Sequence, residues 1–289
     1  MDVYKLRPGL QPVRKIEKGQ FEADTGKSFP WYQNDERGNP AQYAVCPACD
    51  NPIRIIALYK RRENSPPTHG RHTRRSVPGL TGYSQDAYDS CLYANPGIAH
   101  DPTRRRNEND PRGREILHLL REQFDKVIYI ISRITGISIS HALARNMLVT
   151  FLGMRGHLYV GTNMCNLPWM FAYLSNAQGL FGRRIRPDSP LRRVLEQHEK
   201  IRFIEDGRIQ SVPGVFLDLT FCCMHHTIRH TRTSTIETVR FVVSEGRDTL
   251  YEEILEVDPM SFHEVVNASP ERFERKHGLL EIAAELIPA

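Results

Sequence analysis

The chain has 289 residues, of which 40% are hydrophobic and 25% are charged, a composition typical of a folded globular protein and not of a disordered or fibrous one. The N-terminal sequence MDVYKLRPGL lacks the apolar segment of a secretory signal peptide. The longest apolar runs, such as NMLVTFLGM, are well short of the roughly 18–20 residues that cross a bilayer. We therefore expect a soluble, cytoplasmic protein with no membrane partner.

The formal charge of +5 is unevenly distributed along the chain. Residues 1–210 carry 32 Lys+Arg against 21 Asp+Glu, whereas residues 211–289 carry 7 against 13. A basic body with an acidic tail favours a polyanionic partner for the body, most simply nucleic acid. The alternative is a solvated basic surface that serves only solubility.

The N-terminal residues 1–40 are polar and rich in Gly and Pro, which predicts an irregular arm. The runs QYAV and IRIIALY that follow are β-rich, and they flank the short segment CPACDNP. This pattern predicts a β-hairpin with Cys46 and Cys49 at its tip. Disulfide frameworks belong mainly to short secreted chains, so we expect reduced thiols, some of them bound to a metal ion.

The Cys-x2-Cys spacing is typical of one half of a zinc site, because it places two thiolates on one side of a tetrahedral ion. The nearest candidates for the other half are His69 and His72 in THGRH and Cys91 in DSCLY. We favour the set Cys46, Cys49, His72 and Cys91, because a small loop-rich module gains most from a crosslink at its far end. His72 is preferred to His69 because it lies nearer the next element.

Two other interpretations of the cysteine pair remain open. Cys46, Cys49, His69 and His72 would form a Cys2His2 site. A redox pair is the other interpretation, although redox Cys-x2-Cys motifs normally open a helix in a βαβ unit. Around residues 42–59 the pair resembles a zinc ribbon or zinc knuckle, which implies one structural zinc ion with four protein ligands and no open position for water.

Arginine-rich runs lie in or beside this module. Residues 60–82 predict a long basic loop, SQDAYDSCLY predicts a short helix capped by Ser84, and DPTRRRNEND predicts a second basic loop. The planar guanidinium group suits bidentate phosphate contacts and stacking on bases. The residues expected to contact nucleic acid are Arg61, Arg62, Arg71, Arg74, Arg75, Arg104, Arg105 and Arg106.

The middle of the chain predicts helices. Asp110-Pro111 is a strong helix start, and the apolar spacing from Ile116 ends at Gly136. Further helices are expected over residues 138–153, 167–182 and 189–200, with a short strand over 157–162. Residues 130–148 could be a helix-turn-helix, but the second helix carries only Arg145, so a plain helical pair is the better interpretation.

The period then changes to that of strands. Asp206-Gly207 predicts a hairpin, residues 215–224 alternate in polarity, and residues 234–258 predict two strands joined at EGRD. Asp258-Pro259 and Ser269-Pro270 are expected to open two closing helices. The predicted fold class is α+β, with a zinc-stabilised N-terminal module and arm (1–109), a helical region (110–200) and an antiparallel sheet with C-terminal helices (201–289).

A second cluster of possible ligands occurs in FCCMHHTIRH. Regular strand geometry puts Cys223 and His225 on one face and Cys222 and His226 on the other, with the histidines at the solvated end of the strand. A catalytic alternative uses Asp218, His225, His226 and Glu237 as ligands of a divalent ion for phosphodiester hydrolysis.

Three functions follow from these patterns. The first is a zinc-containing nucleic-acid-binding protein, as a subunit of a larger nucleoprotein complex or alone. The second is a metal-dependent nuclease with its site on the C-terminal sheet. The third is a protein-interaction subunit with a structural zinc ion and no nucleic-acid ligand.

Overall fold

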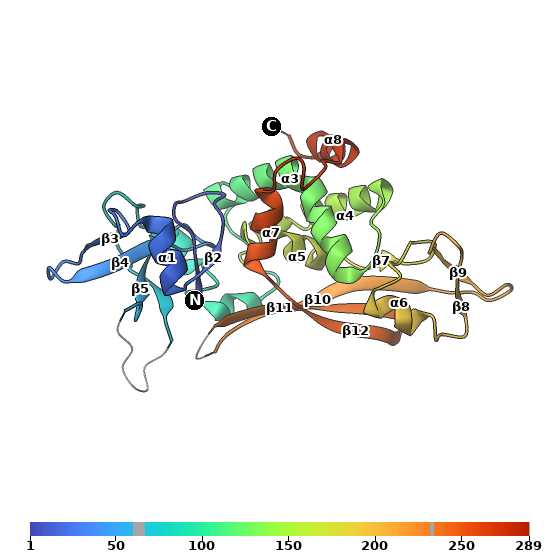
Figure 1. The fold of residues 1–289 in the computed structure, drawn as a ribbon. Coiled ribbons are helices and arrows are strands. Elements are labelled where there is room, and N and C mark those ends of the chain that lie inside the picture. Colours follow the sequence, from blue (N-terminus) through green and yellow to red (C-terminus); the bar gives the residue numbers. More distant parts are fainter. Residues whose placement is uncertain (60–66, 232–233, 289) are drawn as a thin grey trace.

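Two four-stranded antiparallel sheets, one in the N-terminal part and one in the C-terminal part, organise the chain, and helices lie between and above them (Figure 1). The computed structural model describes residues 1–59, 67–231 and 234–288. The fold is α+β, as the sequence predicted. Within the described residues, no helix has both the length and the apolar character needed to cross a membrane.

The N-terminal sheet has the strand order β3-β4-β5-β6. The predicted hairpin around the cysteine turn is confirmed: β4 and β5 pair antiparallel, with Val45 opposite Pro52. The predicted basic loop over residues 60–82 contains an additional strand, β6, which pairs with β5. The strands are β3 (Tyr32–Asn34), β4 (Pro40–Val45), β5 (Pro52–Ile56) and β6 (His69–His72).

The N-terminal arm is more regular than the sequence suggested. It forms β1 (Val3–Tyr4), β2 (Arg14–Lys15) and α1 (Lys18–Thr25), and it supplies β3 to the sheet. Tyr4 and Phe21 are fully buried and pack edge to face at 5.1 Å. The prediction of an irregular arm was wrong because a few apolar anchors among many polar residues suffice to bury one side of a short helix.

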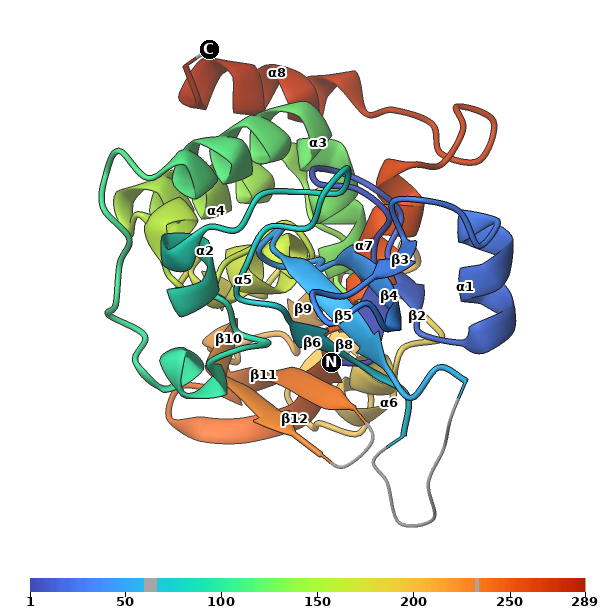
Figure 2. The same ribbon diagram turned by 90° about the vertical axis from the view of Figure 1, so that its left-hand side faces the viewer.

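The helical region begins as predicted. Asp110 caps α3 (Pro111–Thr135) by accepting a hydrogen bond from the backbone N–H of Arg112 at 2.8 Å, and Gly136 ends the helix with φ of 72°. Ser140 caps α4 (His141–Gly153). The C-terminal helix α8 (His277–Leu286) covers α3 and α4 (Figure 2), and Arg145 donates to Glu285 on α8. Since its only cation is paired, α4 does not have the free basic face of a DNA-reading helix.

Two predictions in the middle of the chain need correction. Residues 157–162 do not form a strand, because no extended neighbour pairs with them beyond one bridge between Arg105 and Tyr159. The helix predicted over residues 167–182 ends early as α5 (Leu167–Tyr173), and the following β7 (Gln178–Gly179) joins the C-terminal sheet. The remaining short elements are α2 (Gln85–Asp89), η1 (Pro96–His100), η2 (Gly156–Leu158) and α6 (Pro190–Leu195).

The C-terminal sheet has the strand order β12-β11-β10-β7. One face lies against the helices, so residues such as Phe221 and Phe241 are buried, while Ile254 on the opposite face is 59% exposed. The predicted hairpin at Asp206-Gly207 is confirmed. The hairpin strands β8 (Ile201–Phe203) and β9 (Ile209–Ser211) form a separate two-stranded sheet, and the long strands of the C-terminal sheet are β10 (Leu219–His230), β11 (Thr235–Glu245) and β12 (Asp248–Glu256).

Of the two predicted closing helices, the first is correct. Asp258 caps α7 (Pro259–Val266) by accepting a hydrogen bond from the backbone N–H of Met260 at 2.9 Å. The helix expected at Ser269-Pro270 is wrong, because turns follow that dipeptide and α8 begins only at His277. A Ser-Pro pair favours turns as well as helix starts, and no apolar period follows this one directly.

His263 on α7 provides a test of pH-dependent stability. The side chain is 1% exposed, and burial lowers its pKa to about 4. Between that value and the unfolded pKa of about 6.5, the unfolded chain binds more protons than the folded one, so stability should fall as the pH falls. Lowering the pH from 7 to 4.5 should reduce the free energy of unfolding, measured with urea, in the unaltered protein. In His263→Leu, we expect this reduction to be smaller by about 2–3 kcal/mol. Equal losses in both proteins would contradict this assignment.

Candidate functional site

The four predicted ligands converge in the N-terminal part of the fold. The ligand atoms of Cys46, Cys49, His72 and Cys91 all lie within 4.8 Å of one another, so these residues could hold a metal ion. Cys46 and Cys91 are separated by 3.8 Å between sulfurs, and the Nε2 atom of His72 lies 3.3 Å from the sulfur of Cys49. A tetrahedral ion with sulfur ligands at about 2.3 Å requires ligand-to-ligand edges of about 3.7 Å. The observed separations fit that geometry.

Each ligand comes from a different kind of local structure. Cys46 and Cys49 lie in the turn between β4 and β5, where Asp50 donates its N–H to the carbonyl of Cys46 at 3.1 Å and has φ of 60°. His72 is the last residue of β6, opposite Ile53 of β5. Cys91 follows α2. The cluster therefore joins one hairpin, one edge strand and one helix.

His69, the alternative ligand, does not join this cluster. Its Nδ1 lies 2.9 Å from the carbonyl oxygen of Pro67, and it stands three residues before His72 on the same strand. Residues with this spacing point to opposite faces of a strand. The Cys2His2 interpretation is therefore wrong for this fold.

The electrostatics of the cluster favour a bound cation. Burial raises the pKa of the Cys49 and Cys91 thiols well above the ordinary value. Burial also opposes ionisation of Cys46, but hydrogen bonds from the other two thiols outweigh it and lower the pKa of Cys46. Without a cation, Cys46 is thus the thiol of the three that ionises most readily. A divalent ion would favour the release of the other protons, since only thiolates act as ligands.

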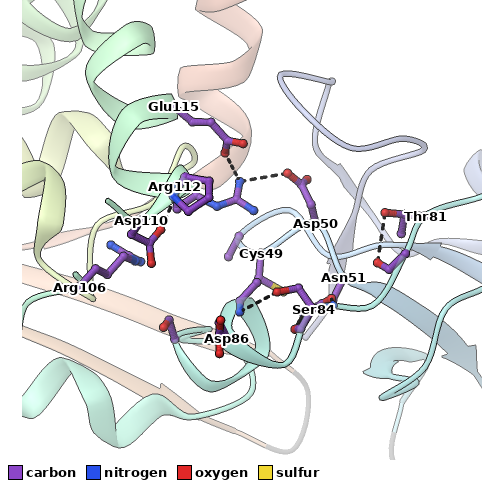
Figure 3. A pocket seen from close by; sticks show the side chains of 15 residues that line it. Cys49, Asp50, Asn51, Thr81, Ser84, Asp86, Arg106, Asp110, Arg112 and Glu115 are labelled. Atoms are coloured by element: carbon purple, nitrogen blue, oxygen red, sulfur yellow. Dashed lines mark hydrogen bonds and ion pairs between the residues drawn. The ribbon is translucent and has the colours of Figure 1, made fainter. Parts of the chain in front are cut away.

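The cysteine turn is anchored to the rest of the protein by the two residues that follow it. Asp50 forms ion pairs with the buried Lys5 and, at 3.0 Å, with Arg112 on the first turn of α3. The side chain of Asn51 accepts from the N–H of Ser84 at 2.7 Å and donates to its carbonyl at 2.9 Å. Figure 3 shows Asp50, Asn51, Ser84 and Arg112 around a cavity of about 330 Å³, where Arg112 pairs with both Asp50 and Glu115.

A larger, cationic groove of about 550 Å³ lies on the other side of the cluster, between β5, β6, the turn after β6 and α2. Tyr43 of β4, Arg54 of β5 and Arg71 of β6 form one row across the sheet, each opposite the next. Like charges directly opposite destabilise a sheet unless they are neutralised. Arg54 pairs with Asp35 at 3.1 Å, whereas Arg71 is exposed and has no acidic partner among the described residues.

Arg74 lines the same groove, next to the ring of Tyr88. Its guanidinium carbon lies 5.0 Å from the centroid of the Tyr88 ring, and its Nη2 donates to the hydroxyl of Tyr88 at 2.8 Å. Arg74 has φ of 55°, a left-handed conformation that is uncommon for residues other than glycine. The neighbouring Arg75 also lines the groove, but it forms an ion pair with Glu36.

The other predicted nucleic-acid contacts have different outcomes. Arg104 is exposed but does not line the groove. Arg105 lies over the ring of Tyr159 at 5.4 Å and donates to the carbonyl of Pro102 at 2.7 Å. Arg106 donates to the carbonyl oxygens of Tyr159 and Val160 at 2.6 and 2.9 Å, and burial lowers its pKa to about 10. Arg106 is thus a structural residue. Arg61 and Arg62 lie outside the described residues.

The second cluster does not assemble as a metal site. His226 and Glu237 are in contact, with 2.8 Å between Nε2 and Oε1, but both are buried. Asp218 precedes β10 at the far end, near the turn between β11 and β12, and His225 is exposed. In the described part of the chain, the only group with metal-site geometry is the one at Cys46.

A β-bulge explains the altered pattern of these histidines. The register of β10 shifts between Met224 and Thr227, and His225 adopts φ of 54°. The bulge places His226 on the same buried face as Cys223. The expectation that His226 lies at the solvated end of the strand, on the face opposite Cys223, was therefore wrong.

The buried histidine belongs to a polar network within the core. His226 Nδ1 lies 3.1 Å from the hydroxyl of Tyr159, and the amide of Asn166 donates to Glu237 at 2.6 Å. Burial raises the pKa of Tyr159, so its hydroxyl stays protonated and can donate to the imidazole. We therefore interpret this network as a structural part of the core.

Comparison with known proteins adds no assignment to this geometry: no family model, no curated protein and no solved structure matches the chain.

Proposed function

We propose that this protein binds nucleic acid through the cationic groove beside the metal cluster, and that the cluster holds one structural zinc ion. The observation that most supports this proposal is the position of Arg71 and Arg74 on either side of His72. A ligand of the metal ion lies within this basic segment, so the ion fixes the backbone that presents both guanidinium groups. Arginine side chains bind phosphate through charge-assisted, often bidentate hydrogen bonds.

The ligand set supports zinc over other metals. Three thiolates and one imidazole are the soft and borderline ligands that zinc prefers in structural sites. Four protein ligands fill a tetrahedron and leave no position for water, so the ion would stabilise the fold and not act in catalysis. Metal analysis of the purified protein should find about one zinc ion per chain.

The proposal predicts a salt-dependent affinity that depends on Arg71. Each phosphate contact contributes nearly one unit to the slope of log affinity against log salt concentration. Arg71→Ala should reduce that slope by about one and weaken binding at low salt, measured by fluorescence anisotropy with labelled oligonucleotides in a potassium chloride series. The slope falls because the variant lacks a cation that has no acidic partner in the part of the chain that the structure describes.

The matched control is Arg193→Ala, which removes the same charge from an exposed position on α6, far from the N-terminal sheet (Figure 1). This variant should keep the slope of the unaltered protein. If no oligonucleotide binds, or if binding is independent of salt, the proposal fails and the protein-interaction hypothesis gains support. Cleavage that depends on a divalent ion would instead favour the nuclease hypothesis.

A further inference from the structure

We infer that the groove takes single-stranded nucleic acid, DNA or RNA, in preference to a duplex, and that Arg74 is a stacking surface for an unpaired base. This inference rests on the proposed function and names its ligand class. Its basis is the arrangement of planar groups in the groove, in addition to the positive charges.

Planar groups gather at one end of the groove, where Arg74 and Tyr88 line it and the ring of Tyr83 lies beside that of Tyr88 at a tilt of 53°. The rings of Tyr83 and Tyr88 lie 6.1 Å apart between centroids, and the guanidinium group of Arg74 lies over Tyr88 at 5.0 Å. Arg74 is exposed, whereas Tyr88 is only partly exposed. Proteins recognise unpaired bases by stacking them on aromatic rings and on guanidinium planes. The outer face of Arg74 offers such a plane.

This stacking surface is held in place before any ligand binds. Nε and Nη2 of Arg74 both donate to the hydroxyl of Tyr88, at 3.1 and 2.8 Å. The ring of Tyr88 in turn packs edge to face on His72 at 5.3 Å. A plane fixed by two hydrogen bonds and a ring contact loses little conformational entropy when a base stacks on it.

The shape of the groove also favours a single strand. Its wall is formed by the sheet, the turn after β6 and the short α2, so the cations and rings line a concavity. A duplex is convex and conceals the faces of its bases, and major-groove reading requires a protruding helix or ribbon. A flexible strand can enter the groove with a phosphate near Arg71 and turn a base onto Arg74.

A polyanion without bases, such as an acidic peptide, would interact with the charge of Arg74 but would not stack on the flat face of its guanidinium group. Arg74→Lys separates these cases, because it keeps the charge and removes the plane. The matched control is Arg193→Lys, which makes the same exchange at an exposed position on α6 outside the groove. Tyr88→Leu is a second variant that removes the ring beneath the guanidinium group.

The experiment measures anisotropy of labelled single-stranded DNA and RNA of about 12 nucleotides, within the range that one small module covers, and of the corresponding duplexes. The unaltered protein should bind at least one single strand at least about tenfold more tightly than the duplex. Arg74→Lys should weaken single-strand binding at least about fivefold, the lower limit for one stacked base, with little change in salt slope. Arg193→Lys should change it less than about twofold, because this position lies outside the groove. Circular dichroism and zinc content verify that each variant is folded.

The outcomes separate the inference from the proposed function. If the duplex binds as tightly as the single strands or more tightly, and the salt slope still depends on Arg71, the inference is wrong but the proposed function stands. Equal weakening by the two lysine variants, or none by Arg74→Lys and Tyr88→Leu, also overturns the inference, because the plane would then have no role. Absence of any binding overturns both.

Discussion

Cys49→Ser should release the metal ion and unfold the N-terminal module. In the proposed zinc site this thiolate is one of four ligands, and a structural zinc ion in a small module contributes on the order of 10 kcal/mol to its folding. The three clustered cysteines form part of a separate small hydrophobic core with residues such as Tyr4, Phe21 and Ile53. Once the ion is lost, that core is too small to compensate for the chain entropy.

The experiment compares zinc content, urea unfolding and limited proteolysis of the variant and of Cys222→Ser. Cys222 is the matched control, because it is a free, partly exposed cysteine on β10 outside the cluster. We expect the control to keep its zinc and its unfolding transition, while the variant loses a protease-resistant fragment that begins near residue 1. A Cys49→Ser protein that retains one zinc ion per chain and an unchanged transition would contradict the assignment of the cluster.

The metal cluster was the part of the site most open to prediction from sequence. A Cys-x2-Cys spacing restricts two ligands to one turn, and the flanking β-rich runs fix that turn as a hairpin tip. The later ligands depended on tertiary structure. His72 could be separated from His69 only when β6 was known to pair with β5, because that pairing decides which face each histidine occupies.

The basic groove was only partly predictable, for a similar reason. Runs of arginine identified Arg71 and Arg74, but Arg54 stood alone in an apolar strand and gave no signal until register placed it opposite Arg71. The triplet at residues 104–106 was harder to interpret from the sequence. Its second and third members donate to main-chain carbonyls, so a run of like charges does not show which guanidinium groups are free.

The bulge at His225 shows a limit of periodic patterns. One inserted residue reverses the faces of every residue beyond it, and the sequence FCCMHHTIRH carries no glycine to mark the position. The same limit applies to α1, where Phe21 is the one buried apolar residue and gives no helical period. Helix starts marked by capping residues, such as Asp110 and Asp258, were predicted correctly, because a cap is a local interaction.

His226→Ala should lower the free energy of unfolding by about 3–5 kcal/mol, because removal of one partner leaves the buried Glu237 carboxylate without its imidazole. The carboxylate accepts from His226 at 2.8 Å and from Asn166 at 2.6 Å, and both Glu237 and His226 are at most 5% exposed. The remaining amide cannot replace the lost donor. Urea unfolding followed by circular dichroism of the sheet measures the change.

The neighbouring histidine supplies the matched control. His225 is exposed at the bulge, and asparagine tolerates its left-handed conformation, so His225→Asn should change stability by less than about 0.5 kcal/mol. A double variant, His226→Phe with Glu237→Leu, removes both polar partners and should recover much of the loss, since apolar residues of similar volume often replace a buried pair at little cost. If His226→Ala were as mild as His225→Asn, the buried network would not stabilise the core. If instead the double variant were no more stable than His226→Ala, the cost would lie in packing and not in the unpaired carboxylate.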